Sequence, residues 1–388
     1  MSSPLPRHST QEKDSDMLVN EAAWLNAPGT RLEVGPAPYT HPADDELVVR
    51  GHAVAVNPLD WTIQYAGKVF NGWIKTPFVL GADVAGEVVE VGKDVTRFKP
   101  GDRVLALTEG TDKDSNSAAR GAFQTYSVVL ERLTSPLPSA LSYEEGAVVP
   151  LAAATAACAL FQPEFLALAP PSAHPARRDQ TVLVWGGSTS VGSAAIQLAV
   201  AAGYDVLTTA SPRNFDHVRR LGASQVFDYA SPTVVSDIIR ALQGVTVAGA
   251  VAVPTGSAKP TARVLAHATG TRFLAMASGP VSFSELARDR RRRWLMPRLL
   301  LQMGTETAVL QLRCRVRGIR TTFIWGTNLK NNEVGKAVFE DYLPAALADA
   351  RYQAVPQPLV VGSGLGSIQA GLDTQVAGVS ARKVVVTL

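Results

Sequence analysis

TVLVWGGSTSVGSAAIQLAVAAGYDVLTTAS (residues 181–211) is the most informative segment of this chain. An apolar run ends in two glycines, an Ala-rich stretch with the composition of a helix ends at Gly203, and a second apolar run follows. NFDHVRRLGA (214–223) predicts another helix that stops at Gly222, and SQVFDY (224–229) predicts a third strand. This alternation predicts an α/β fold built on a parallel sheet with right-handed crossovers.

The turn within this segment, in WGGSTSVGSAAIQLA (185–199), has the context of a dinucleotide-binding loop, because it lies between a predicted strand and a predicted helix. Glycines allow the backbone to approach a pyrophosphate, and the first N–H groups of the helix form a positive pole for it. An ordinary strand-to-helix turn is the simpler alternative. The predicted binding residues are Gly186, Gly187, Ser188, Thr189, Ser190 and Val191.

The end of the second strand indicates which nicotinamide cofactor fits. A site that prefers NAD usually carries an acidic residue about 20 residues past the glycines, but this chain has Ser211-Pro212-Arg213 there. A hydroxyl and a guanidinium can bind a 2′-phosphate, since arginine makes charge-assisted, bidentate bonds to phosphate. We therefore predict NADPH, bound in part by Ser211 and Arg213. Tyr229 either borders the adenosine pocket or is a strand-end aromatic residue.

Before this segment the chain is rich in short β-branched runs, ELVVRGHAVAV (46–56), VLGADVAGEVVEVG (79–92) and GDRVLAL (101–107). They predict strands joined by turns, with no long helix between them. EEGAVVPLAAATAACALF (144–161) predicts a helix, with Ser142 as N-cap and Glu145 three residues later. From residue 355 onward the chain returns to strand-like runs, which we expect to fold back onto the first half.

Composition excludes several classes of protein. The 388 residues include 37 Lys and Arg against 34 Asp and Glu, a net charge of +3 that is too small to indicate a nucleic-acid binder. Two cysteines can form neither a disulfide framework nor a four-thiolate zinc site. The polar N-terminus lacks a signal-peptide core, and Pro150 interrupts the longest uncharged stretch, which favours a buried helix over a membrane span. We expect a cytoplasmic protein.

Several ordered motifs resemble the medium-chain dehydrogenase/reductase superfamily from about residue 30 to the C-terminus. One of them is the glycine-rich turn of residues 185–199, called the glycine loop below. The others are VNPLDW (56–61), GADVAGEVVEVG (81–92), KPGDRV (99–104), PLAAATAACALF (150–161) and GVSARKVVV (378–386). The chain looks like the zinc-free quinone-reductase and enoyl-reductase branch, especially fungal trans-acting enoyl reductases. The resemblance implies a GroES-like β-barrel catalytic domain and a Rossmann domain with a doubly wound parallel sheet. The expected divisions are a disordered leader (1–20), the catalytic domain (21–160), the NADPH-binding domain (161–327) and a C-terminal return to the catalytic domain (328–388).

The chain also departs from the zinc-containing members of that superfamily. They carry Cys where this chain has Asn57, and a His-Glu pair where it has Ala82-Asp83. Their structural-zinc lobe has four clustered cysteines, and this chain has none between Arg97 and Arg120. We therefore predict no metal site.

Without a metal, the protein must orient and polarise an acceptor for a hydride from the nicotinamide. A conjugated C=C–C=O group suits this chemistry, provided that donors face the developing enolate. By resemblance, the active-site positions are Asn57, Thr62 and Thr155. Thr62 replaces a Tyr or Lys of the relatives, so the α-carbon proton is expected from water.

Each of these residues has a structural alternative. Asn57 can cap a turn before Pro58, Asp60 is better explained as a turn-stabilising carboxylate than as a general acid, and Thr155 can be a small packing residue. The aromatic residues Trp61, Tyr65, Phe70 and Trp73 either line an apolar pocket or belong to the core.

We expect an NADPH-dependent reductase of an activated C=C bond in an enoyl or quinone-like substrate. The substrate is either a free small molecule or an intermediate carried by a polyketide synthase, and a silent NADPH-binding partner protein is the alternative from another class. The basic run 288–293 is either a solvated helix face or a docking patch for an acidic carrier. No nucleic-acid or membrane partner is expected, and both a monomer and a homodimer are compatible with the sequence.

Overall fold

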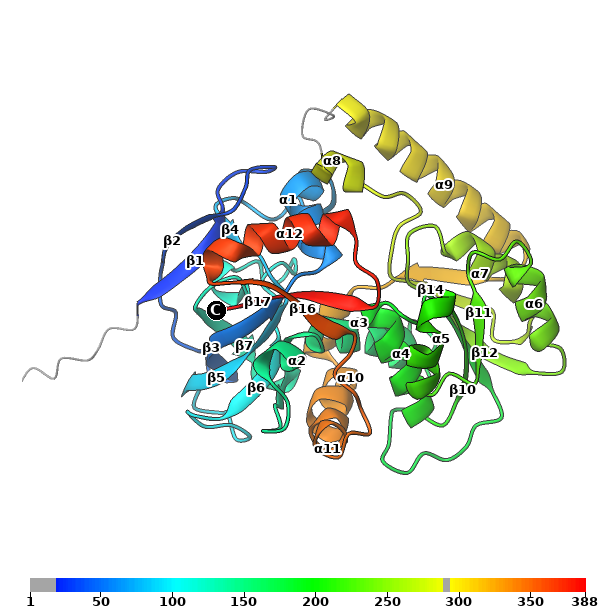
Figure 1. Ribbon diagram of the computed structural model, residues 1–388, viewed down its shortest axis with the longest axis horizontal. Coiled ribbons are helices and arrows are strands. Elements are labelled where there is room, and N and C mark those ends of the chain that lie inside the picture. Colours follow the sequence, from blue (N-terminus) through cyan, green and yellow to red (C-terminus); the bar gives the residue numbers. More distant parts are fainter. Residues whose placement is uncertain (1–18, 289–293) are drawn as a thin grey trace, which may run out of the picture.

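The computed structural model describes residues 19–288 and 294–388, which form two sheet-based domains side by side (Figure 1). Most of the leader predicted at 1–20, and the arginines of the basic run after Arg288, lie outside the described residues. The first strand, β1, already begins at Asn20.

The second domain is built on a parallel sheet with the strand order β11-β10-β9-β12-β14-β15. This order reverses direction between β9 and β12, which is the switch point where doubly wound folds bind ligands. The predicted α/β class is confirmed, as are the three predicted strands and the two helices between them. The strands are β9 (Thr181–Trp185), β10 (Asp205–Ala210), β11 (Gln225–Asp228), β12 (Thr246–Ala252), β13 (Thr269–Gly270), β14 (Phe273–Met276) and β15 (Arg320–Phe323).

Helices connect and cover this sheet, and the long α9 runs diagonally across the upper right of Figure 1 to reach it. They are α4 (Ser190–Ala201), α5 (Phe215–Arg220), α6 (Val234–Ala241), α7 (Ala258–Leu265) and α9 (Met296–Val316). The short helix α8 (Ser284–Arg288) instead contacts α1 (Pro58–Phe70) and α12 (Ile368–Ala377) of the other domain.

The other domain joins strands from the first half of the chain to the C-terminal strands in one sheet, ordered β16-β17-β3-β5-β6-β8, with β7 on β3. The C-terminal strand β17 pairs antiparallel with β3, so the red end of the chain in Figure 1 lies beside a blue segment. The strands are β3 (Glu46–Ala55), β5 (Asp83–Val91), β6 (Arg103–Leu107), β7 (Tyr126–Leu130), β8 (Thr134–Pro136), β16 (Gln357–Ser363) and β17 (Arg382–Thr387), and a separate sheet holds β1 (Asn20–Leu25), β2 (Glu33–Ala37) and β4 (Phe78–Val79).

One prediction for this domain is wrong, because a 13-residue helix, α1 (Pro58–Phe70), lies where no long helix was expected. Asn57 is its N-cap and shares a capping box with Asp60, while Pro58 occupies the first turn. The helix buries Trp61, Ile63 and Ala66. The Asn-Pro-x-Asp sequence that was interpreted as a turn is therefore the beginning of a helix.

The predicted Ala-rich helix is present in two parts, α2 (Tyr143–Ala147) and α3 (Pro150–Phe161). The predicted N-cap is confirmed, since Ser142 Oγ accepts a bond of 3.2 Å from Glu145 N. Within the described residues, Tyr143–Phe161 is the one segment long and apolar enough to cross a membrane, and 83% of its most apolar stretch is buried inside the protein. It is a core helix that packs against α4. The remaining helices are α10 (Glu333–Gly335), α11 (Leu343–Ala348) and α12 (Ile368–Ala377).

Candidate functional site

A cavity of about 830 Å³ lies between the two domains. One wall is formed by the ends of β9 and β10 and the beginning of α4, and the other by the beginning of α1 and β17. The cavity therefore lies at the switch point of the parallel sheet, where the carboxyl ends of the strands leave a crevice.

The glycine loop forms the first wall, and all but one of the residues predicted at 186–191 line the cavity. Thr189 is the N-cap of α4, since its hydroxyl accepts a bond of 3.1 Å from Gly192 N and donates one of 2.7 Å to Gly186 O. The N–H groups of Ser190 and Val191, in the first turn of α4, have no acceptor among the described residues. These unpaired donors on the cavity wall are suited to an anion such as a pyrophosphate.

Gly187 is the exception, since it does not line the cavity. A Cβ atom at this position would lie less than 3 Å from the Thr208 hydroxyl and 2.8 Å from Ile196 Cδ1. Glycine is therefore needed here for packing between the sheet and α4. Its contact with a dinucleotide stays a prediction.

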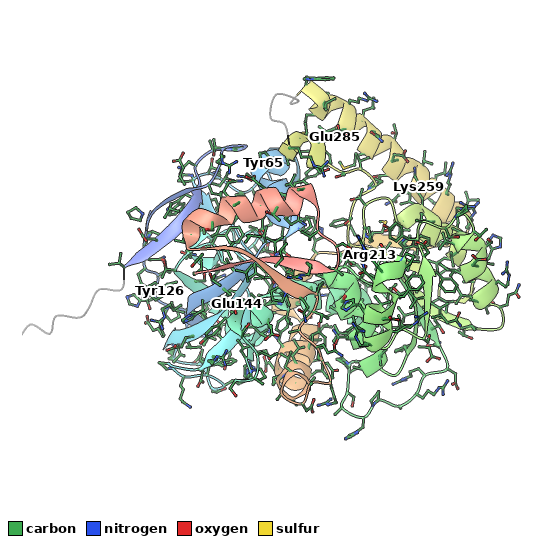
Figure 2. The ribbon with its side chains drawn as sticks, in the orientation of Figure 1. Tyr65, Tyr126, Glu144, Arg213, Lys259 and Glu285 are labelled. Atoms are coloured by element: carbon green, nitrogen blue, oxygen red, sulfur yellow. The ribbon has the colours of Figure 1, made fainter. Side chains whose placement is uncertain are left out.

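The three residues predicted to bind the adenosine end also line the cavity, beyond the ends of β10 and β11. Ser211 Oγ lies 3.5 Å from the hydroxyl of Tyr229. Arg213 is exposed and makes no ion pair with another described residue. Figure 2 places it where the parallel sheet domain faces the loop before β17.

Charge is distributed unevenly around the cavity. The described residues that line it include three cations, Arg213, Arg382 and Lys383, and no carboxylate. Asp83 compensates the charge of Lys383, so Arg213 and Arg382 are the lining cations that favour a polyanionic ligand, and no acidic side chain in the described lining repels a 2′-phosphate.

The opposite wall contains a buried polar cluster formed by Asn57, Asp83 and Lys383. Lys383 Nζ lies 3.0 Å from Asp83 Oδ2 and also donates to Asn57 Oδ1. Asn57 Nδ2 donates to Asp83 Oδ2 at 2.8 Å, and Leu151 N, at the beginning of α3, donates to Asp83 Oδ1 at 2.6 Å. The cluster therefore joins α1, β5, α3 and β17 at one point of the cavity wall.

Asp60 lies behind this wall and is buried, at 1% exposure. Its carboxylate accepts bonds from Asn57 N at 2.7 Å and from Gly81 N at 3.2 Å, which supports the structural interpretation of this residue. Burial raises the pKa of Asp60 to about 7, and the negative charge of Asp83 acts in the same direction.

We predict a pH dependence of stability from Asp60. Its pKa is 3.8 in an unfolded chain and about 7 in the folded protein, so its stabilising contribution is complete below pH 3.8 and is lost as the pH rises through 7. The unfolding free energy of the wild type should therefore fall between pH of about 5 and about 8. Because Asp60→Asn does not titrate at this position, its unfolding free energy should fall by less, the difference being on the order of 2–3 kcal/mol. Urea unfolding of both proteins at the two pH values measures this difference, and equal losses would contradict it.

The three residues predicted as catalytic are not brought together on the cavity wall. Asn57 lines the cavity, whereas Thr62 and Thr155 do not. The hydroxyl of Thr62 donates to Pro58 O and that of Thr155 to Leu151 O, both at 2.7 Å and one helical turn back. Their catalytic roles stay predictions, and the bond of Thr155 fits the packing alternative given for that residue.

Among the residues that the structure describes, no group of three or more His, Cys, Asp or Glu side chains is arranged to hold a metal ion. Cys158 is buried in α3 and donates to Trp325 O at 3.3 Å. Burial raises the pKa of its thiol, as expected for a packed side chain rather than a nucleophile. The absence of a metal site stays a prediction.

Lys383 was not predicted from the sequence as a residue of this cavity, although the sequence contains one signal for it. Within GVSARKVVV, a lysine stands at the edge of a run of valines that predicts a buried strand, and a buried lysine needs a partner. Lys383 is 5% exposed.

Comparison with known proteins agrees with this architecture. Residues 43–139 match the model of the alcohol dehydrogenase GroES-like domain. The chain is 49% identical to "Dehydrogenase pigH" of Monascus ruber over 96% of its own length and 100% of that protein. It is 37% identical to "Trans-enoyl reductase himH" of Aspergillus japonicus, over 96% and 98% of the two chains. Among solved structures, a mycobacterial protein complexed with NADPH aligns with a TM-score of 0.65 and 22% identity, over 95% of this chain and 100% of that one.

Proposed function

The chain belongs to the medium-chain dehydrogenase/reductase superfamily, in its quinone-reductase and enoyl-reductase branch, and on this premise we propose that it reduces an activated C=C bond with NADPH and without zinc. The superfamily consists of nicotinamide-dependent oxidoreductases. The identity of the acceptor and the preference for NADPH are the parts that we propose.

The lining of the cavity is the observation that carries the proposal. The N–H donors of Ser190 and Val191 are suited to the pyrophosphate, and Ser211 and Arg213 are suited to the 2′-phosphate. The mycobacterial protein of the same fold was solved with NADPH, which agrees with this assignment.

When bound, NADPH supplies a hydride to the β-carbon of a conjugated acceptor and leaves as NADP⁺. The residues of this chain bind the dinucleotide at its phosphates and hold the acceptor against the wall formed by Asn57 and Trp61. The negative charge that develops on the acceptor's oxygen requires a hydrogen-bond donor from this wall. The α-carbon then takes a proton, for which water is the proposed source.

An activity assay tests the proposal. Purified protein treated with a chelator is mixed with NADPH and a panel of enones and quinones, and the absorbance of the reduced nicotinamide is followed. We expect oxidation of NADPH with at least one enone, and a product heavier by two hydrogen atoms. Saturable NADPH binding with no turnover across the panel would instead favour a silent cofactor-binding partner, and turnover restored only by added zinc would exclude the metal-free reaction.

The relatives favour a second form of the same activity, in which the substrate is attached to a carrier. Several of them bear the name trans-enoyl reductase, at 33–37% identity. We therefore propose a polyketide synthase as partner and the cytoplasm as location. Comparing kcat/KM for one enoyl group as a free enone, as a pantetheine thioester and on a carrier protein tests this form, and a preference for the free enone would contradict it.

A further inference from the structure

The hydrogen bonds of Asn57 leave it no donor for a substrate. Its Nδ2 donates to Asp83 Oδ2 at 2.8 Å and lies 3.4 Å from Ala55 O, and its Oδ1 accepts from Lys383. A side-chain amide has two N–H groups, and both are directed at protein acceptors. The residue expected to polarise the acceptor therefore cannot do so in this arrangement.

Lys383 has the donor that Asn57 lacks. A lysine ammonium has three N–H groups, and the hydrogen bond to Asn57 and the ion pair with Asp83 occupy two of them. The third has no acceptor among the described residues. Lys383 lines the cavity and is only 5% exposed, so a ligand in the cavity is the remaining candidate partner for this N–H.

The other polar side chains of this wall are less suited to the task. Trp61 Nε1 donates to Gln375 Oε1. Arg382 is exposed and its Nη2 donates to Pro358 O at 2.7 Å. Gln375 and Ser380 are left as neutral donors, which stabilise an oxyanion less than a cation does.

Asp83 makes it possible to bury the ammonium. An isolated buried charge is strongly unfavourable, and an ion pair is tolerated only where further hydrogen bonds hold it. The Asp83 side chain is fully buried, accepts from Leu151 N and Asn57 Nδ2, and forms an ion pair with Lys383. The bonds from Leu151 and Asn57 fix the Asp83 carboxylate, and the fixed carboxylate holds the ammonium in one position.

We propose that Lys383 is a catalytic residue, whose third N–H donates to the carbonyl oxygen of the acceptor, and that Asn57 and Asp83 are positioning residues. This inference rests on the proposed function. A C–H bond forms at the β-carbon with the hydride's electron pair, and the π electrons of the C=C bond move to give an enolate that Lys383 stabilises. The α-carbon takes a proton from water, the nicotinamide is oxidised, and Lys383 keeps its proton throughout.

Substitution of Lys383 separates catalysis from cofactor binding. Lys383→Met should lower kcat by on the order of 100- to 1,000-fold, the usual loss for one oxyanion donor, and leave the Kd for NADPH within about two-fold. Lys383→Arg should retain part of the activity. The matched control is Lys99→Met, which removes a lysine whose side chain is 82% exposed and should leave activity unchanged.

A double variant distinguishes catalysis from simple neutralisation of Asp83. In Lys383→Met with Asp83→Asn, no unpaired carboxylate remains in the wall, so the fold should be retained even if the single variant unfolds. We expect this double variant to bind NADPH and to remain inactive. Recovery of wild-type turnover would mean that Lys383 only compensates Asp83, and it would overturn the inference.

Binding of an enolate mimic gives a readout without turnover. We use 4-nitrophenol, whose anion absorbs differently from its neutral form, with protein saturated with NADP⁺. The wild type should bind the anion in preference to the phenol, and the double variant should bind the anion at least about ten-fold more weakly. Equal binding of the anion by both proteins would overturn the role of Lys383. Absence of NADPH binding or enone reduction by the wild type would instead overturn the proposed function.

Discussion

Arg213→Ala should weaken NADPH binding by about 1.5–3 kcal/mol, on the order of 10- to 150-fold, and leave NADH binding nearly unchanged. Arg213 lines the cavity beyond β10, and the described lining contains no carboxylate. Its guanidinium is therefore available for the phosphate that distinguishes the two cofactors.

Titration of nicotinamide fluorescence with wild-type and variant protein gives both dissociation constants. The matched control is Arg220→Ala, because Arg220 is an exposed arginine in the neighbouring α5 that does not line the cavity. An equal loss of affinity for NADPH and NADH would contradict the assignment of the phosphate to Arg213.

Gly192→Ala should abolish cofactor binding and lower the stability of the protein. A Cβ atom at this position would lie less than 3 Å from Gly186 O and 2.9 Å from Gly187 Cα. Since both are backbone atoms, α4 must move away from the loop, and the N–H groups of Ser190 and Val191 move with it. Overpacking of this kind costs about 1–3 kcal/mol, and sometimes more.

Thermal unfolding and NADPH titration measure the two effects separately. Gly304→Ala is the matched control, because this helical glycine in α9 has open space where a Cβ would be placed. It should keep wild-type affinity for NADPH. Full NADPH binding by Gly192→Ala would mean that the first turn of α4 does not hold the cofactor.

The parallel sheet domain could be predicted because its signals are local. The strand, turn, helix and second strand of 181–211 follow one another directly, and the helix has its own local cap in the bond between Thr189 and Gly192. The beginning of α2 has a local cap of the same kind, in the bond between Ser142 and Glu145. Where the chain carries its own capping residues, the sequence is sufficient.

Helix α1 was missed although its capping box is also local. The structural interpretation of Asn57 and Asp60 was a turn and not a helix N-terminus, because an Asn before a Pro is common in turns. The Asp three residues after the Asn is the additional signal of a helix N-terminus, and Pro at the first helical position agrees with it.

The buried cluster could not be found from local patterns. Lys383 and Asn57 are 326 residues apart in the chain. They meet because β3 pairs with both β17 and β5, which places Val385 and Asp83 opposite the same residue, Ala55. Only this register brings a lysine near the C-terminus to an aspartate of the first half.

In the proposed reaction, a hydride passes from NADPH to a carbon of the substrate, with no metal taking part. The most direct test is a single turnover of chelator-treated protein with NADPH deuterated at the reactive C4 position and an α,β-unsaturated thioester. We predict that the deuterium is found at the β-carbon of the saturated product. A product without deuterium, or transfer that occurs only after zinc is added, would contradict the claim.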